Sequence, residues 1–226
     1  MSFKRLTIPD VFPAGDALTS QLVSIGFRFA ADPAKDEPNI EDCLIAASVE
    51  GLRGDLRTLG LLVDWVEVHM KQINVERLST ILKRISEPRL SAFWGSIAKW
   101  KKSDSRFDKV YRLYRGPRIP LLDEEAMAFH LKRDGEDPRF HNTKLIIPNK
   151  VLRHRLDDIA DIVTVAKSHL SYKHRLIIGP TYRADMWAAL EREPQLSPSA
   201  LARKCYGSFS TAWNVKKDWD IVRQAV

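Results

Sequence analysis

Residues 182–226 read YRADMWAALEREPQLSPSALARKCYGSFSTAWNVKKDWDIVRQAV, and this stretch predicts three short helices in succession. Thr181 is a suitable N-cap for the first helix, because its hydroxyl can accept a hydrogen bond from a free backbone N–H. Ser197 can cap the second helix, and a proline follows it at the first helical position. Ser208 can cap a third helix, which we expect to extend through Ile221.

The pattern within these helices resembles that of the helix-turn-helix family. The family has a small residue midway along its second helix, where the third helix crosses closely, and Ala202 lies there. Four further positions of the family are apolar, two around the small residue and two on the third helix; here they are Leu201, Cys205, Ala212 and Val215. The turn glycine of the family would fall at Tyr206, but the glycine is Gly207. We therefore expect a turn with a slightly different path.

The resemblance implies that the third helix enters the major groove of DNA with its N-terminal half. Its outward residues would then contact base edges or phosphates, and they are Ser210, Thr211, Asn214 and Lys217. Three basic residues are expected to contact phosphates, which fix position rather than sequence, namely Arg203, Lys204 and Lys216. The alternative is a three-helix cap with a structural role, whose core would hold Trp187, Trp213 and Trp219. A winged form is disfavoured, because only residues 222–226 remain for a wing.

No catalytic motif in the sequence is complete. Gly207-Ser208 followed by Asp218 and Asp220 resembles the pattern with which polymerase-β-type nucleotidyltransferases hold Mg²⁺. That family places a helix and then a strand between the two parts, whereas residues 208–221 predict one continuous helix. The six histidines show no metal-ligand spacing, and no phosphate-binding glycine loop is present. We therefore predict that the chain is not an enzyme and binds no metal or cofactor.

The charge of the chain is distributed unevenly. Its net charge is +7, but residues 1–100 hold 12 basic and 13 acidic residues, whereas residues 101–226 hold 24 and 16. The basic excess therefore lies entirely in the half that contains the three predicted helices. Such an asymmetry favours a polyanionic partner.

A second basic feature is residues 99–118, for which we predict a basic helix. Apolar side chains recur there with helical spacing at Phe107, Val110, Tyr111 and Tyr114. The basic residues that would cover the rest of its surface include Arg106, Lys109, Arg112 and Arg115. This helix could follow a nucleic-acid backbone, DNA in the first instance and RNA as a weaker option. Alternatively, its long side chains could form a solvated face over the core.

The remaining sequence predicts a mainly α fold. Four helices are expected between Ile40 and Lys102, where they would begin at Asn39, Asp55, Asn74 and Pro88. Another is expected from Asp123 to Arg133, and a long one from Pro148 to Leu170. Two short apolar runs, 144–147 and 176–178, predict strands that could pair. The predicted fold is thus mainly α, with room for one short two-stranded β element.

We divide the chain into three regions. A helical N-terminal region (1–118) would serve interaction or dimerisation, residues 119–180 would connect, and residues 181–226 would form the helix-turn-helix-like module. The expected function is that of a DNA-binding protein, a transcriptional regulator of bacterial type. The alternative is an antitoxin-like or adaptor protein whose helical body binds a partner protein. DNA is the expected partner, with a partner protein or a homodimer as further candidates, and no small-molecule ligand is indicated.

The expected location is the cytoplasm. No run of apolar residues is long enough to span a membrane, and the first residues lack the apolar stretch of a signal peptide. The two cysteines, Cys43 and Cys205, lie far apart on predicted apolar helix faces, where free thiols usually pack as small hydrophobic groups.

Overall fold

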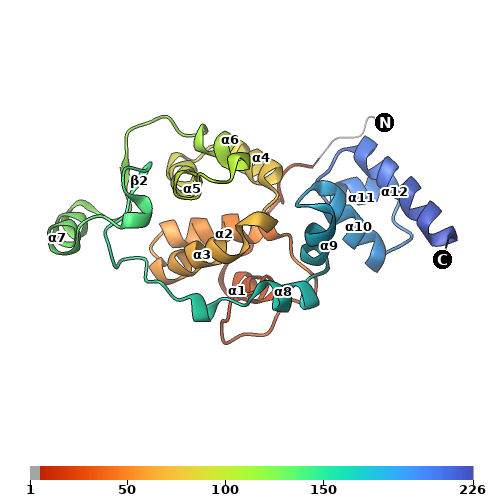
Figure 1. Ribbon diagram of the computed structural model, residues 1–226, viewed down its shortest axis with the longest axis horizontal. Helices are drawn as coiled ribbons and strands as arrows, with labels where there is room; N and C mark the ends of the chain where they lie inside the picture. The colour runs from red at the N-terminus through yellow and green to blue at the C-terminus, as the bar shows by residue number, and fades with distance from the viewer. Residues whose placement is uncertain (1–5, 226) are drawn as a thin grey trace.

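The computed structural model describes residues 6–225, and its fold is mainly α-helical, as predicted (Figure 1). Residues 1–5 of the predicted first region and Val226 of the predicted last region lie outside the described residues. The elements follow in this order: α1 (Gly15–Ser24), α2 (Ile40–Leu52), α3 (Leu56–His69), α4 (Val75–Ile85), α5 (Pro88–Trp100), α6 (Asp108–Tyr111), β1 (Ile119–Pro120), α7 (Glu124–Asp134), β2 (Leu145–Ile146), α8 (Ile162–Ser168), α9 (Leu170–Ile178), α10 (Tyr182–Arg192), α11 (Pro198–Lys204) and α12 (Phe209–Gln224). Short 3₁₀ turns connect some of them: η1 (Met70–Gln72), η2 (Ser105–Phe107), η3 (Pro138–Phe140) and η4 (Leu156–Asp158).

The helix starts are where their capping residues predict them. Six predicted N-cap side chains each accept a backbone N–H from the first turn of their helix: Asn39, Asp55, Asn74, Thr181, Ser197 and Ser208. A cap of this kind contributes about 1 kcal/mol to helix stability. None of the helices within residues 6–225 combines the length and apolarity needed to cross a membrane.

Two separate groups of buried side chains hold the chain together. The larger lies in the helical body and includes Trp65 and Trp94, whose indole N–H groups donate to Ile25 O (2.7 Å) and Ser48 Oγ (3.0 Å). The smaller lies within residues 182–219 and belongs to α10, α11 and α12. In Figure 1 these three helices occupy one end of the molecule, and α7 occupies the opposite end.

The β element differs from the predicted one. β1 and β2 pair in parallel, with Ile119 opposite Leu145 and Pro120 opposite Ile146. The run at 144–147 therefore forms a strand, as predicted. The run at 176–178 does not, because it is the last turn of α9, where Ile177 is 70% exposed.

The long helix predicted for residues 148–170 is wrong. Residues 159–161 lie in an extended segment beside residues 26–28, where Ala160 N–H donates to Gly26 O at 2.8 Å and Arg28 N–H donates to Asp158 O at 2.8 Å. Helix begins only at Ile162, after Asp161 caps α8. The extended chain also passes closely over α3, since a Cβ on Gly60 would lie 3.3 Å from the carbonyl oxygen of Arg153. Tertiary pairing with an earlier segment thus overrides the helical spacing of the apolar residues.

The single basic helix predicted for residues 99–118 is also wrong. α5 ends at Trp100, and α6 comprises only residues 108–111. Asp104 caps the 3₁₀ turn η2 that follows, because its carboxylate accepts the backbone N–H and the guanidinium of Arg106. Phe107 and Val110 are nevertheless buried in the body, as their spacing predicts.

A buried ionic contact attaches the three C-terminal helices to the body. Arg175 of α9 donates to both carboxylate oxygens of Glu41, at 2.7 and 2.8 Å, and to both of Asp185, at 2.8 and 2.9 Å. The carbonyl of Gln72 accepts a further hydrogen bond from this guanidinium at 2.9 Å. Burial lowers the pKa of Arg175, but the two carboxylates raise it further, so the side chain stays charged. Glu41 belongs to α2 and Asp185 to α10, so Arg175 links the body to the C-terminal helices.

Candidate nucleic-acid interface

The turn between α11 and α12 has the hydrogen bonds of a Schellman motif. Gly207 N–H donates to Ala202 O at 2.9 Å, and Tyr206 N–H donates to Arg203 O at 3.2 Å. The residue with left-handed backbone in this motif is Tyr206, with φ of 57°, rather than the adjacent glycine. The left-handed residue therefore falls where the helix-turn-helix family has its glycine, although the side chain is a tyrosine.

Contacts with the body stabilise this unusual conformation of Tyr206. A left-handed backbone costs a non-glycine residue about 1–2 kcal/mol. The guanidinium carbon of Arg77 lies 3.5 Å from the centroid of the Tyr206 ring, and such cation–π contacts contribute about 0.5–2 kcal/mol. Burial raises the pKa of Tyr206 to about 12, so its hydroxyl stays protonated and can donate to the carboxylate of Asp42. The start of α12 is thus fixed by α2 and α4 as well as by its own module.

The five residues that carry the resemblance lie inside the three-helix core. Leu201 and Ala202 of α11, Cys205 after it, and Ala212 and Val215 of α12 are all buried. Gly207 lies close to the end of a flexible side chain of α10, which would have to move if the residue carried a Cβ. A Cβ there would lie 2.2 Å from Cε of Met186 in α10.

The outward face of α12 carries three of the predicted contact residues. Ser210, Asn214 and Lys217 are exposed and follow one another at positions i, i+4 and i+7, which places them on one side of the helix. Thr211 is half-buried, and its hydroxyl lies 2.7 Å from that of the capping Ser208. Lys216 is half-buried as well and donates to Pro194 O at 3.0 Å, besides pairing with Asp220 at 2.8 Å.

Two exposed aromatic side chains lie beside this face, and the sequence analysis did not place them there. Phe209 is 39% exposed and Trp213 is 56% exposed, with their ring centroids 6.2 Å apart. The core alternative assigned Trp213 to the interior, whereas Trp187 and Trp219 pack against each other with centroids 5.4 Å apart. Phe209 and Trp213 are four residues apart at the start of the predicted third helix, and this spacing was the signal from which a neighbouring aromatic pair could have been predicted.

The two predicted phosphate contacts on α11 differ in whether their side chains are already paired within the protein. Arg203 and Lys204 are both exposed near the end of the helix. Lys204 forms an ion pair with Glu193. No ion pair or hydrogen bond of the Arg203 side chain occurs within residues 6–225.

The predicted basic contact residues of the body also differ in whether their side chains are paired within the protein. Arg106 pairs with Asp104 at 2.6 Å, and its guanidinium lies 3.4 Å from carbonyl oxygens in η1 and just after it. These contacts give the Arg106 side chain a structural role that requires no nucleic acid. Lys109, Arg112 and Arg115 are exposed, and none of them forms an ion pair with another part of the described chain.

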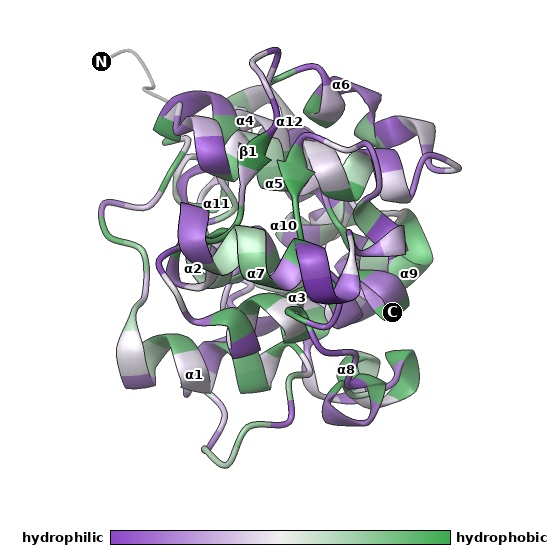
Figure 2. Ribbon diagram, turned by 90° about the vertical axis from the view of Figure 1, so that its left-hand side faces the viewer, coloured by the Kyte–Doolittle hydropathy of each residue, from purple (hydrophilic) through white to green (hydrophobic). Residues whose placement is uncertain are grey.

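The helices that carry the two basic features lie toward the same edge of the molecule. In Figures 1 and 2, which are related by a rotation about the vertical axis, α4, α6 and the start of α12 all lie along the upper edge. The backbone of α6 and the start of α12 therefore lie toward one edge of the molecule, although the two helices are far apart in the sequence.

One group of side chains has the composition of a metal site. Ligand atoms of Asp64, Glu67 and His154 lie within 4.8 Å of one another. Both oxygens of Asp64 are already engaged, because His154 Nδ1 lies 2.7 Å from one and Arg155 N–H donates to the other at 2.5 Å. Asp64 is also fully buried, and the three residues are better explained as a structural contact. Sequence spacing could not reveal this group, because 90 residues separate Asp64 from His154.

The rejected nucleotidyltransferase pattern has no support in the geometry of α12. Asp218 and Asp220 lie two apart on a continuous helix and therefore point to different sides of it. Asp218 pairs with Arg183 at 2.7 Å and Asp220 with Lys216 at 2.8 Å. In comparisons with protein-family models, with curated proteins and with solved structures, no match to this chain was found.

Proposed function

We propose that this chain is a DNA-binding protein that reads sequence with the N-terminal half of α12, in the role of a transcriptional regulator. The observation that carries the proposal is the outward face of α12, where Ser210, Asn214 and Lys217 are exposed on a helix fixed by two others. A helix presented in this way fits the major groove of B-DNA. The capped start of the helix adds backbone N–H groups that favour phosphate nearby.

The side chains on this face suit different parts of a DNA duplex. The amide of Asn214 can donate to N7 and accept from N6 of adenine, which distinguishes adenine from the other bases. The hydroxyl of Ser210 can bond to a base or a phosphate, and Lys217 suits guanine or phosphate. Trp213 and Phe209 add apolar surface beside the polar face, where a thymine methyl group can pack.

The body would add contacts to the phosphate backbone. Lys109 of α6 and Arg112 and Arg115 just after it are exposed, and α6 lies toward the same edge of the molecule as the start of α12 (Figure 1). Contacts of this kind increase affinity without reading sequence. Arg106 is left out of this interface because its guanidinium is engaged with Asp104.

A salt titration with a random-sequence duplex tests the proposal. The binding constant should fall steeply with salt concentration, because each neutralised phosphate releases counterions. Lys217→Gln should reduce the slope of log K against log salt by about 1. Lys132→Gln is the matched control, since Lys132 is an exposed lysine on α7, at the opposite end of the molecule from the three C-terminal helices. Absence of binding at ~50 mM salt, or equal slopes for both variants, would contradict the proposal.

A second candidate function is a protein-interaction module of the antitoxin or adaptor kind. The observation in its favour is the exposed apolar surface of α9, where Leu176 is 44% and Ile177 70% exposed. Figure 2 shows this apolar stretch of α9 at the edge of the molecule. Exposed apolar surface of this kind is typical of interaction sites. Ile177→Lys should abolish association with a protein partner and leave DNA binding unchanged if the two functions use separate surfaces.

A further inference from the structure

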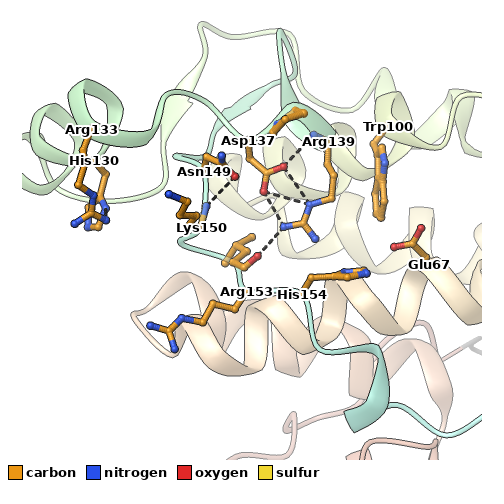
Figure 3. Close-up of a pocket in the computed structure, with 12 residues that line it drawn as sticks. Glu67, Trp100, His130, Arg133, Asp137, Arg139, Asn149, Lys150, Arg153 and His154 are labelled. Carbon is orange, nitrogen blue, oxygen red and sulfur yellow. Dashed lines mark hydrogen bonds and ion pairs between the residues drawn. The ribbon is translucent and has the colours of Figure 1, made fainter.

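A large cavity opens near the end of the molecule that carries α7, opposite the three C-terminal helices (Figure 1). Its volume is about 950 Å³, within the range of about 300–1,000 Å³ that is typical of small-molecule sites. Side chains from α3, α5, α7 and residues 149–154 surround it (Figure 3). The cavity is therefore built from parts of the sequence that lie far apart.

Cationic side chains face this cavity, and a buried carboxylate holds two of them in place. Lys150 Nζ lies 2.7 Å from one oxygen of Asp134, and Arg133 Nε lies 2.6 Å from the other. The Asp134 side chain is only 4% exposed, whereas those of Lys150 and Arg133 are 71% and 52% exposed. The positive charge thus faces the cavity while the negative charge lies behind it.

The same arrangement recurs at the centre of the cavity, as Figure 3 shows. Arg139 donates to Asp137, whose side chain is 3% exposed, and to the carbonyl of Leu152 at 2.7 Å. Nη1 of Arg139 is buried without a hydrogen-bond acceptor and lies 3.8 Å from a carboxylate oxygen of Asp64. His154 is 52% exposed and directs Nδ1 to the buried Asp64, which leaves Nε2 for other contacts.

The backbone at Lys150 is held in an uncommon conformation. Its φ is 65°, in the left-handed region that few non-glycine residues adopt. The side-chain oxygen of Asn149 accepts the Lys150 N–H at 3.0 Å and stabilises this turn. Strained residues that are fixed by their surroundings are concentrated at ligand sites. This turn sets the position of the Lys150 side chain at the cavity.

We propose that this cavity binds a small molecule that carries a phosphate group. Lys150, Arg133 and the exposed Arg153 would hold the phosphate, because ammonium and guanidinium groups form strong charge-assisted hydrogen bonds with it. Trp100, which is half-buried, lines the cavity as well and provides apolar surface for an organic part of the ligand. Glu67 is a carboxylate exposed at the cavity, and Lys101 pairs with it at 3.3 Å. This proposal does not depend on the proposed DNA-binding function.

Calorimetric titration of the full chain, in a buffer free of phosphate, tests this inference. Pyrophosphate and adenosine 5′-monophosphate are the two probes, and at least one should bind saturably with a Kd of about 1 mM or lower. Tighter binding of the nucleotide would mean that the apolar surface of Trp100 contributes to binding. Tighter binding of pyrophosphate would favour an inorganic phosphate or polyphosphate as the ligand. Absence of saturable binding of both probes would overturn the proposal.

Variants assign the binding to this cavity. Lys150→Gln and Arg153→Gln should each weaken binding by about tenfold, because each removes a charge-assisted hydrogen bond. Both side chains are exposed, so the fold should persist, and circular dichroism can verify this. Lys83→Gln is the matched control, an exposed lysine on α4 that does not line the cavity, and it should bind as the original chain does.

Two further results would overturn the inference. Equal binding by Lys150→Gln, Arg153→Gln and the original chain would mean that phosphate binds elsewhere. Displacement of the probe by a short DNA duplex, together with weaker duplex binding by Lys150→Gln, would make the cavity part of a nucleic-acid surface instead. Retained probe binding at saturating duplex supports a separate small-molecule site.

Discussion

Replacing Arg175 with methionine should destabilise the protein more than any exposed charge substitution. The guanidinium is fully buried and bonds to Glu41 and Asp185 through both oxygens of each carboxylate. Arg175→Met leaves two buried carboxylates close together without a cation. Removing one partner of a buried ion pair costs about 3–5 kcal/mol, so a loss near 5 kcal/mol is expected. That is a third or more of the stability of a typical domain, about 5–15 kcal/mol.

Urea denaturation at pH 7, followed by circular dichroism and tryptophan fluorescence, measures this loss. The control is Arg183→Met, which breaks a half-exposed pair with Asp218 and should cost less than about 1 kcal/mol. Asp185→Asn, added to Arg175→Met, should restore part of the stability because one buried negative charge is removed. The deficit of Arg175→Met should also shrink as the pH falls from 7 toward about 4, because burial raises the pKa of Asp185 and favours its protonated form.

The reasoning is refuted if Arg175→Met costs no more than Arg183→Met. It is also refuted if Asp185→Asn makes the Arg175→Met variant still less stable, since the buried negative charge would then not be the cause.

Two further predictions concern the packing and titration of the body. Gly51→Ala should cost about 1–3 kcal/mol in urea unfolding, because the added Cβ would lie 2.6 Å from Cβ of Leu59 and 3.1 Å from its Cα, so α2 and α3 must separate. An unchanged midpoint would show that the two helices are not in close contact. Burial lowers the pKa of His69 to about 4, so the unfolded chain takes up a proton below about pH 6.5 that the folded chain does not. Stability should therefore fall as the pH decreases from 6.5 to 4, by roughly 3 kcal/mol from this residue, and His69→Gln should show a shallower decrease. An equal pH dependence in both proteins would contradict the assignment.

Local signals in the sequence were sufficient for most helices. A capping side chain acts within three residues of itself, so Asn74 and Ser208 mark their helices without knowledge of the fold. The resemblance to the helix-turn-helix family likewise placed Ala202, Ala212 and Val215 in the interior, and all three are buried.

Non-local contacts explain where the sequence analysis failed. Residues 148–161 have helical spacing but form turns and extended chain, because the segment at 26–28 supplies a pairing partner that periodicity cannot reveal. The charge of Asp104 does not reveal its role, which is to cap the separate 3₁₀ turn η2 after the end of α5.

The candidate sites were predictable to different degrees. The outward positions of Ser210, Asn214 and Lys217 follow from helical spacing within one short segment. The phosphate cavity could not be found in this way, since Glu67, Arg133 and Lys150 meet only after the body has folded. The junction at Arg175 was missed for the same reason, because 134 residues separate it from Glu41.

Selection of preferred duplexes from a random library, performed with the original chain and with Asn214→Ala, tests the central claim most directly. If α12 reads DNA, the original chain should enrich a defined sequence, and Asn214→Ala should relax one position of it. The variant should bind the preferred duplex more weakly by about 1–3 kcal/mol. Failure of the original chain to enrich any sequence, or an identical preference in the variant, would contradict the assignment of α12 as the reading element.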